Sequence, residues 1–155
     1  MGRMYTAVLS ATSIGSAADL LWFQSSSLTC TIVHEIKVSQ EAGETSEQLP
    51  IAVIYATTSN AAQGQSITPT PVNPGDPAFA GLVRAAVSTL STVYKPVWRD
   101  GQNVINGWHF LPTPETRPIL SPTNSGNGRM AVQLPNAPAA ALTISAYAVL
   151  EEIGG

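Results

Sequence analysis

The two histidines are the first residues to weigh as catalytic groups, because a general base in an enzyme is most often a histidine. His34 stands beside Glu35 in a segment with strand periodicity, where neighbouring side chains point to opposite faces of the sheet. We therefore expect that these two side chains do not act together. His109 lies between Trp108 and Phe110 in an aromatic stretch, which favours a packed or interface residue over a base.

The remaining reactive groups predict no catalytic, metal or cofactor site. Cys30 is the only cysteine, and its place in an apolar strand-like segment favours a buried, inert thiol. The acids Glu151 and Glu152 are adjacent, so on a strand they diverge, and solvation of the chain's end is their expected role. The sequence has no Gly-x-Ser-x-Gly motif and no cysteine pair or acidic loop with metal-ligand spacing. We expect a protein that is not an enzyme.

The composition is that of one weakly charged globular domain spanning residues 1–155. Only 11% of the residues are charged, against roughly 25% in a typical soluble domain. The net charge is −3, and the seven Lys and Arg residues are dispersed, so no basic stripe predicts nucleic-acid binding. No stretch reaches the ~20 apolar residues of a membrane helix. Such a charge deficit favours a surface that lies against other protein.

The hydrophobic periodicity is that of β-strands. Short apolar segments alternate with turn residues, and the segments from 28 to 38 and from 142 to 153 place apolar side chains at every second position. The predicted strands are Met4–Ser13, Leu28–Val38, Leu49–Thr57, Val104–Leu111, Arg129–Leu134 and Leu142–Ile153. This pattern predicts an all-β, single-domain, jelly-roll-like β-sandwich.

Long proline-rich loops and at most one or two short helices complete the expected fold. Thr68–Pro77 holds four prolines in ten residues, which is incompatible with a helix or a central strand. Pro112–Pro118 and Ser121–Gly128 are also irregular. Two segments are candidates for short helices. At Ser16–Phe23, Ser16 and Asp19 form a weak capping box. At Phe79–Leu90 the apolar spacing fits a helix, but the Val, Ser and Thr content makes helix and no helix equal alternatives.

Three tryptophans and several tyrosines raise an alternative class of function. Trp22, Trp98 and Trp108 could form a platform for a carbohydrate, although aromatic side chains more often fill cores and interfaces. Their spacing marks no exposed row. Sugar binding therefore stands as an alternative to a purely structural role.

Five segments together resemble a group of small virion proteins of tailed bacteriophages. They are the opening MGRMYTAV, the HEI at residues 34–36, TPTPVNPGD at 68–76, WHFLPTPETRP at 108–118 and the closing LEEIGG. The resemblance runs over nearly the whole chain, and its motifs are structural. It implies a capsid decoration (cement) protein, a homotrimer on the capsid surface, made in the host cytoplasm and bound to the major capsid protein.

The resemblance also implies which residues contact partners. In this interpretation Thr68–Pro77 and Pro112–Pro118 are arms that reach neighbouring subunits, with Trp108 and Arg117 as anchors. The candidate interface residues are Pro69, Pro71, Pro74, Trp108, His109, Pro112, Pro114 and Arg117. The simpler alternative is that both segments are rigid connections between strands.

Two other placements in the particle remain open. One is a binding module of a tail or head fibre that recognises a receptor or a sugar, and the other is a structural subunit of the tail or baseplate. In each case we expect the charged residues at Gln40–Gln48 and at Glu151 and Glu152 to stay in contact with water.

Overall fold

Twelve strands make up nearly all of the regular structure in the computed structural model, which describes residues 2–42, 46–122 and 128–154. The one helix in these ranges is a short 3-10 turn, η1. The elements are β1 (Arg3–Ile14), β2 (Ala18–Gln24), β3 (Cys30–Ala42), β4 (Gln48–Ala56), β5 (Gln65–Ile67), β6 (Thr70–Pro71), β7 (Leu82–Val87), β8 (Val93–Asn103), β9 (Trp108–Phe110), η1 (Pro114–Thr116), β10 (Ile119–Leu120), β11 (Arg129–Leu134) and β12 (Leu142–Ile153).

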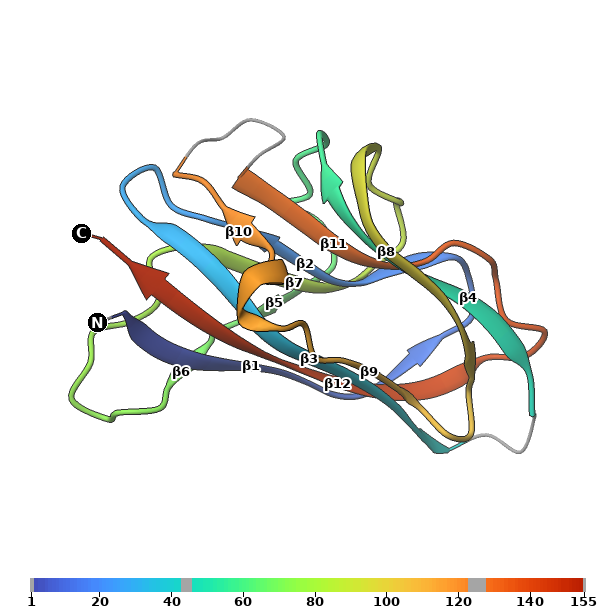
Figure 1. Ribbon diagram of the computed structural model, residues 1–155. Helices are drawn as coiled ribbons and strands as arrows, with labels where there is room; N and C mark the ends of the chain where they lie inside the picture. The colour runs from blue at the N-terminus through green and yellow to red at the C-terminus, as the bar shows by residue number, and fades with distance from the viewer. Residues whose placement is uncertain (1, 43–45, 123–127, 155) are drawn as a thin grey trace.

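The strands form two antiparallel sheets that pack face to face, so the predicted all-β sandwich is confirmed (Figure 1). Sheet A has the order β10-β3-β12-β1-β6, with β9 also pairing with β3. Sheet B has the order β5-β7-β2-β11-β4-β8. The chain crosses from sheet B to sheet A between β5 and β6, and both ends of the chain lie on the same side of the molecule (Figure 1).

The core lies between the sheets and follows strand alternation. On β12 the buried positions are every second residue, from Leu142 to Leu150, while Thr143, Ser145 and Tyr147 face outward. The inner face of sheet B contributes Leu21, Phe23, Val53, Val83 and Val132 to the same cluster. The sequence predicted β1, β4, β11 and β12 within one residue of the observed bounds, while the strand predicted at Leu28–Val38 is observed as Cys30–Ala42.

The strand β2 corrects the expected helix at Ser16–Phe23. Residues 18–23 are all buried, because β2 is a central strand with protein on both of its faces. The outer face of sheet B holds a second cluster of Trp22, Ile54, Ala56 and Ala131. Ala61, in the loop after β4, packs against this cluster. A strand covered on both sides shows no alternation, which is why its apolar run fits a helix equally well.

The segment Phe79–Leu90 also forms a strand and not a helix. In β7 the side chains of Val83, Ala85 and Val87 are buried and their neighbours are more exposed. Antiparallel pairing with β2 on one side and β5 on the other fixes this conformation. The expected strand Val104–Leu111 is only partly correct, because its first residues form a turn between β8 and β9.

The expected irregular segments are largely loops. Thr68–Pro77 contains only the two-residue strand β6, and Pro112–Pro118 contains η1. Residues 123–127 of the segment Ser121–Gly128 and residues 43–45 of the charged segment Gln40–Gln48 lie outside the described residues. Within the described ranges, no helix is both long and apolar enough to cross a membrane.

Candidate functional site

The outer face of sheet A is the candidate site, because it combines three β-bulges with two histidine–carboxylate pairs, whereas sheet B has bulges alone among the described residues. The register between β1 and β12 shifts between Leu9 and Thr12, and the register between β12 and β3 shifts in two places. Bulges reorient side chains and are common beside functional sites. Here one pair of bulges flanks Ser145 and the third lies at His34.

The bulge at His34 corrects the expectation that His34 and Glu35 point to opposite faces. Leu150 pairs with Val33 and Val149 pairs with Glu35, which leaves His34 as the additional residue on β3. Its Nε2 lies 2.8 Å from Oε2 of Glu151, an outward residue of β12. Simple alternation fails at this point of the strand, so both side chains lie on the outer face.

Glu35 is the centre of a second histidine–carboxylate pair. The Nε2 atom of His109 lies 2.8 Å from Oε1 of Glu35, and the hydroxyl of Tyr147 donates to the same oxygen. The Tyr147 hydrogen bond is the main cause that lowers the pKa of Glu35, and His109 adds to the effect. The same contact raises the pKa of Tyr147. Glu35 is therefore an ionised acceptor that positions His109 of β9 and Tyr147 of β12, the two strands that pair with β3 on either side of it.

Replacing Tyr147 by phenylalanine should raise the pKa of Glu35 toward its ordinary value. A lowered pKa in the folded state adds stability above the ordinary carboxyl pKa, and this stability is lost as the pH falls. Carbon-13 NMR titration of the Glu35 carboxyl measures the change. Tyr55→Phe is the matched control, because the Tyr55 hydroxyl bonds backbone atoms of Ile119. An unchanged Glu35 titration in Tyr147→Phe would refute this assignment.

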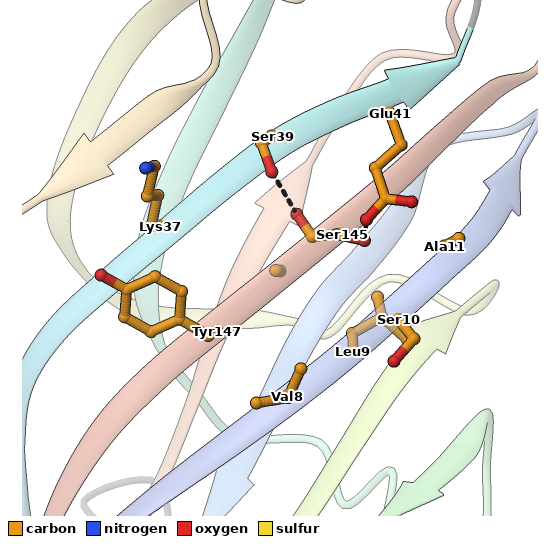
Figure 2. Close-up of a pocket in the computed structure, with 10 residues that line it drawn as sticks. Val8, Leu9, Ser10, Ala11, Lys37, Ser39, Glu41, Ser145 and Tyr147 are labelled. Atoms are coloured by element: carbon orange, nitrogen blue, oxygen red, sulfur yellow. Dashed lines mark hydrogen bonds between the residues drawn. The ribbon is translucent and has the colours of Figure 1, made fainter.

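A shallow depression of about 240 Å³ lies between the bulges (Figure 2). Small side chains from three strands line it, with Ser10 and Ala11 on β1, Ser39 on β3 and Ser145 on β12. The hydroxyl of Ser39 donates to the Ser145 carbonyl over 3.4 Å, and the hydroxyl of Ser145 donates to Glu41. Lys37 and Glu41 also line it, so the depression offers hydroxyl groups and one charge of each sign, which suits hydrogen bonding with another protein surface.

The outer face of sheet B carries a buried polar network that the sequence did not predict. Asp19 is fully buried and accepts hydrogen bonds from the backbone and hydroxyl of Ser91, from Asn60 Nδ2 at 3.2 Å and from Gln133 Nε2 at 2.9 Å. Burial raises the pKa of Asp19 although these bonds oppose the rise. The network connects the loops after β4 and β7 to β2 and β11. The sequence feature that could have indicated this network is Asp19 itself, a single acid within the apolar run 18–23.

The end of the chain holds a second buried acid, which corrects the expectation that both terminal glutamates contact water. Glu152 is 3% exposed and accepts hydrogen bonds from Thr29 Oγ1 at 3.1 Å and from the Ala80 backbone at 3.0 Å. Glu151 points to the other face and bonds His34. The two acids do diverge, as adjacent strand residues must, but only Glu151 remains half-exposed.

The predicted interface prolines divide between the two edges of sheet A. Pro71 of β6 pairs with Tyr5 of β1, Pro69 is buried beside it, and Pro74 is exposed in the following turn. Pro112 and Pro114 lie beyond β9 at the opposite edge. The structure therefore does not bring the candidate interface residues into one site.

Trp108 belongs to the core and not to the surface. Its side chain is 7% exposed and stacks on Phe110, so in this conformation it offers little area to a partner. His109 and Arg117 keep part of their surface exposed, and their role as interface residues stays a prediction. Cys30 is half-buried, where burial was expected, and it is a free thiol.

The described residues contain no group of three or more His, Cys, Asp or Glu side chains that could hold a metal ion. Comparisons with protein-family models, with curated proteins and with solved structures find no match for this chain. Its own geometry must therefore support any functional assignment.

Proposed function

We propose that this chain is a non-catalytic structural protein of a tailed-phage virion, a capsid decoration protein that assembles as a homotrimer on the major capsid protein. The resemblance of its sequence motifs to such virion proteins suggests the class. The outer face of sheet A supports it. Decoration proteins stabilise a shell by binding its assembled form better than its free subunits.

The observation that carries the proposal is an uncharged stripe along the two central strands of sheet A. Outward residues of β1 and β12 between the Met4–Glu151 pair and the Ser13–Thr143 pair carry no charge. They are Thr6, Val8, Ser10, Ala11, Ser13, Thr143, Ser145, Tyr147 and Val149. Charged residues are depleted at the centres of protein interfaces, so this stripe has the composition of a contact surface.

The edge of β1 extends the same surface. Among the described residues, β6 pairs with β1 only at Tyr5 and Thr6, so strand pairing on that edge ends there. From Ala7 to Ile14, β1 has neither proline nor charge. By contrast, the edge strand β8 carries Lys95, Pro96 and Arg99, the residue types that protect an edge from pairing. We place the contact between subunits at β1.

Electron cryomicroscopy of the phage particle that carries this chain tests the proposal. We expect density for the β-sandwich on the shell at local three-fold positions, with sheet A facing a neighbouring subunit. Density found only at the tail or baseplate, or no density in the particle, would overturn the assignment to the capsid.

The mass of the purified protein in solution tests the trimer separately. Light scattering should give three times the 16.2 kDa of one chain. Val8→Lys should lower this mass, because Val8 is 56% exposed at the centre of the stripe. Val93→Lys is the matched control, since Val93 is 50% exposed on the protected edge β8. A monomeric wild-type protein, or equal effects of the two lysines, would refute assembly through β1.

A further inference from the structure

A groove of about 410 Å³ opens between the edge strand β8 of sheet B and the β9–η1 segment at the opposite edge of sheet A from β1. Its volume falls in the range of small-molecule sites, about 300–1,000 Å³. Trp98, Leu111 and Pro112 supply apolar surface, while Asp100, His109 and Thr116 supply polar groups. The groove thus combines a large apolar surface with a few polar groups, as ligand sites do.

Trp98 is a half-exposed aromatic surface held on a rigid base. Its side chain is 52% exposed, although it opposes the buried Val53 and so points toward the space between the sheets. The ring lies 6.0 Å from that of Phe110, which stacks on Trp108 at 5.9 Å with an angle of 10° between the planes. This series of rings runs from the groove into the core. A surface fixed in this way loses little entropy when a ligand stacks on it.

The polar groups beside Trp98 are also fixed. Oδ1 of Asp100 accepts a hydrogen bond from the Gly101 backbone at 2.8 Å. His109 is 47% exposed and is held through Nε2 by Glu35. Carboxylate, imidazole and threonine hydroxyl together offer both acceptors and donors.

We propose that this groove binds a neutral pyranose residue of a saccharide, with the C–H face of the sugar on Trp98 and its hydroxyls toward Asp100, His109 and Thr116. A pyranose has one apolar face and a rim of hydroxyl groups, which matches the two parts of the lining. The carboxylates of Asp100 and Glu35 oppose an acidic sugar. This activity goes beyond the proposed structural role and uses the edge of sheet A opposite to β1.

Tryptophan fluorescence tests the site, because Trp98 is half exposed whereas Trp22 is fully buried and Trp108 is 7% exposed. The probes are chitotriose, cellotriose and maltotriose as neutral sugars, trigalacturonic acid as an acidic sugar and trilysine as a cation. We expect a saturable shift with at least one neutral trisaccharide below about 10 mM. Trigalacturonic acid and trilysine should give none.

Two substitutions in the groove and one control at a distance locate the binding. Asp100→Asn should weaken it about tenfold, the effect of losing one charge-assisted hydrogen bond. Asp76→Asn, at the opposite edge of sheet A, should leave it unchanged. Trp98→Ala should abolish binding. Because the Trp98 ring also covers part of the core, this variant could lose binding through altered packing, and Asp100→Asn is the test that does not depend on packing.

Three results would overturn the proposal. One is the absence of a saturable shift with all three neutral sugars. Another is a tighter response to trilysine, which would make the groove a site for cationic peptides. The last is equal binding by Asp100→Asn and wild-type protein.

Discussion

Replacing Asp19 by alanine should lower the free energy of unfolding by about 3–5 kcal/mol, because three buried donors lose their acceptor and each such loss costs about 1–3 kcal/mol. In a region closed to water, the substitution removes the acceptor of the Ser91 backbone N–H, of the Ser91 hydroxyl and of one N–H of Gln133. The Asn60 amide keeps the Thr89 carbonyl and the Ser91 hydroxyl as acceptors. The substitution also releases the loop after β7 and the loop after β4, whose Ala61 packs against the cluster around Trp22. Urea denaturation at neutral pH measures the loss.

The Asp19 effect should depend on pH in a defined direction. Its pKa in the folded protein is raised by burial, so the folded state binds a proton more readily than the unfolded chain does. The stability that Asp19 contributes is therefore greatest below the ordinary aspartate pKa and falls as the pH rises through the raised value. The difference in stability between wild-type and Asp19→Ala should narrow from acid to neutral pH.

Asp100→Ala is the matched control, since it makes the same chemical change at an exposed position of β8. Substitutions at exposed positions usually change stability by no more than about 0.5 kcal/mol. If Asp19→Ala costs no more than Asp100→Ala, the network does not hold the loops. A difference that widens with rising pH would contradict the raised pKa.

Strands with one buried face were predictable, and strands buried on both faces were not. The alternation of β12 is visible in the sequence because Thr143, Ser145 and Tyr147 separate its buried residues. In β2, Leu21 and Phe23 pack between the sheets while Trp22 packs under a loop. The cause of that second burial is a contact with residues about 40 positions away, which local periodicity does not encode.

In the candidate site, too, local periodicity fails to predict which face a side chain occupies. Strand periodicity alone places His34 and Glu35 on opposite faces, and one additional residue on β3 brings both to the outer face. A bulge is set by the pairing partner, here β12, and no residue type in the segment 34–36 indicates it. The sequence was therefore enough to predict the sheet, but the face on which a single side chain lies could be determined only from the structure.

The structure also sharpens the meaning of the low charge content. Of the ten acidic residues, Asp19 and Glu152 are buried, and Glu35 and Glu151 are half-buried in histidine pairs. These four acids thus bond other parts of the chain, and the two buried ones, Asp19 and Glu152, add no charge to its surface.

Replacing Glu152 by alanine should lower the free energy of unfolding by about 2–4 kcal/mol, because each buried donor left unsatisfied costs about 1–3 kcal/mol. The carboxylate accepts from Thr29 and from the Ala80 backbone, and the Tyr5 hydroxyl lies 3.5 Å away. It therefore joins β12 to the segment before β3 and to the loop before β7. Chemical denaturation measures the loss.

Glu151→Ala provides an unusually close control, because it makes the same change one residue earlier. The Glu151 side chain is 19% exposed and its partner His34 is 18% exposed, so water can replace much of what each loses, and we expect a cost of about 1 kcal/mol or less. Glu152→Gln should fall between the two alanine variants, since it keeps one acceptor oxygen. Equal losses in Glu151→Ala and Glu152→Ala would mean that burial of the last acid does not hold these three segments together.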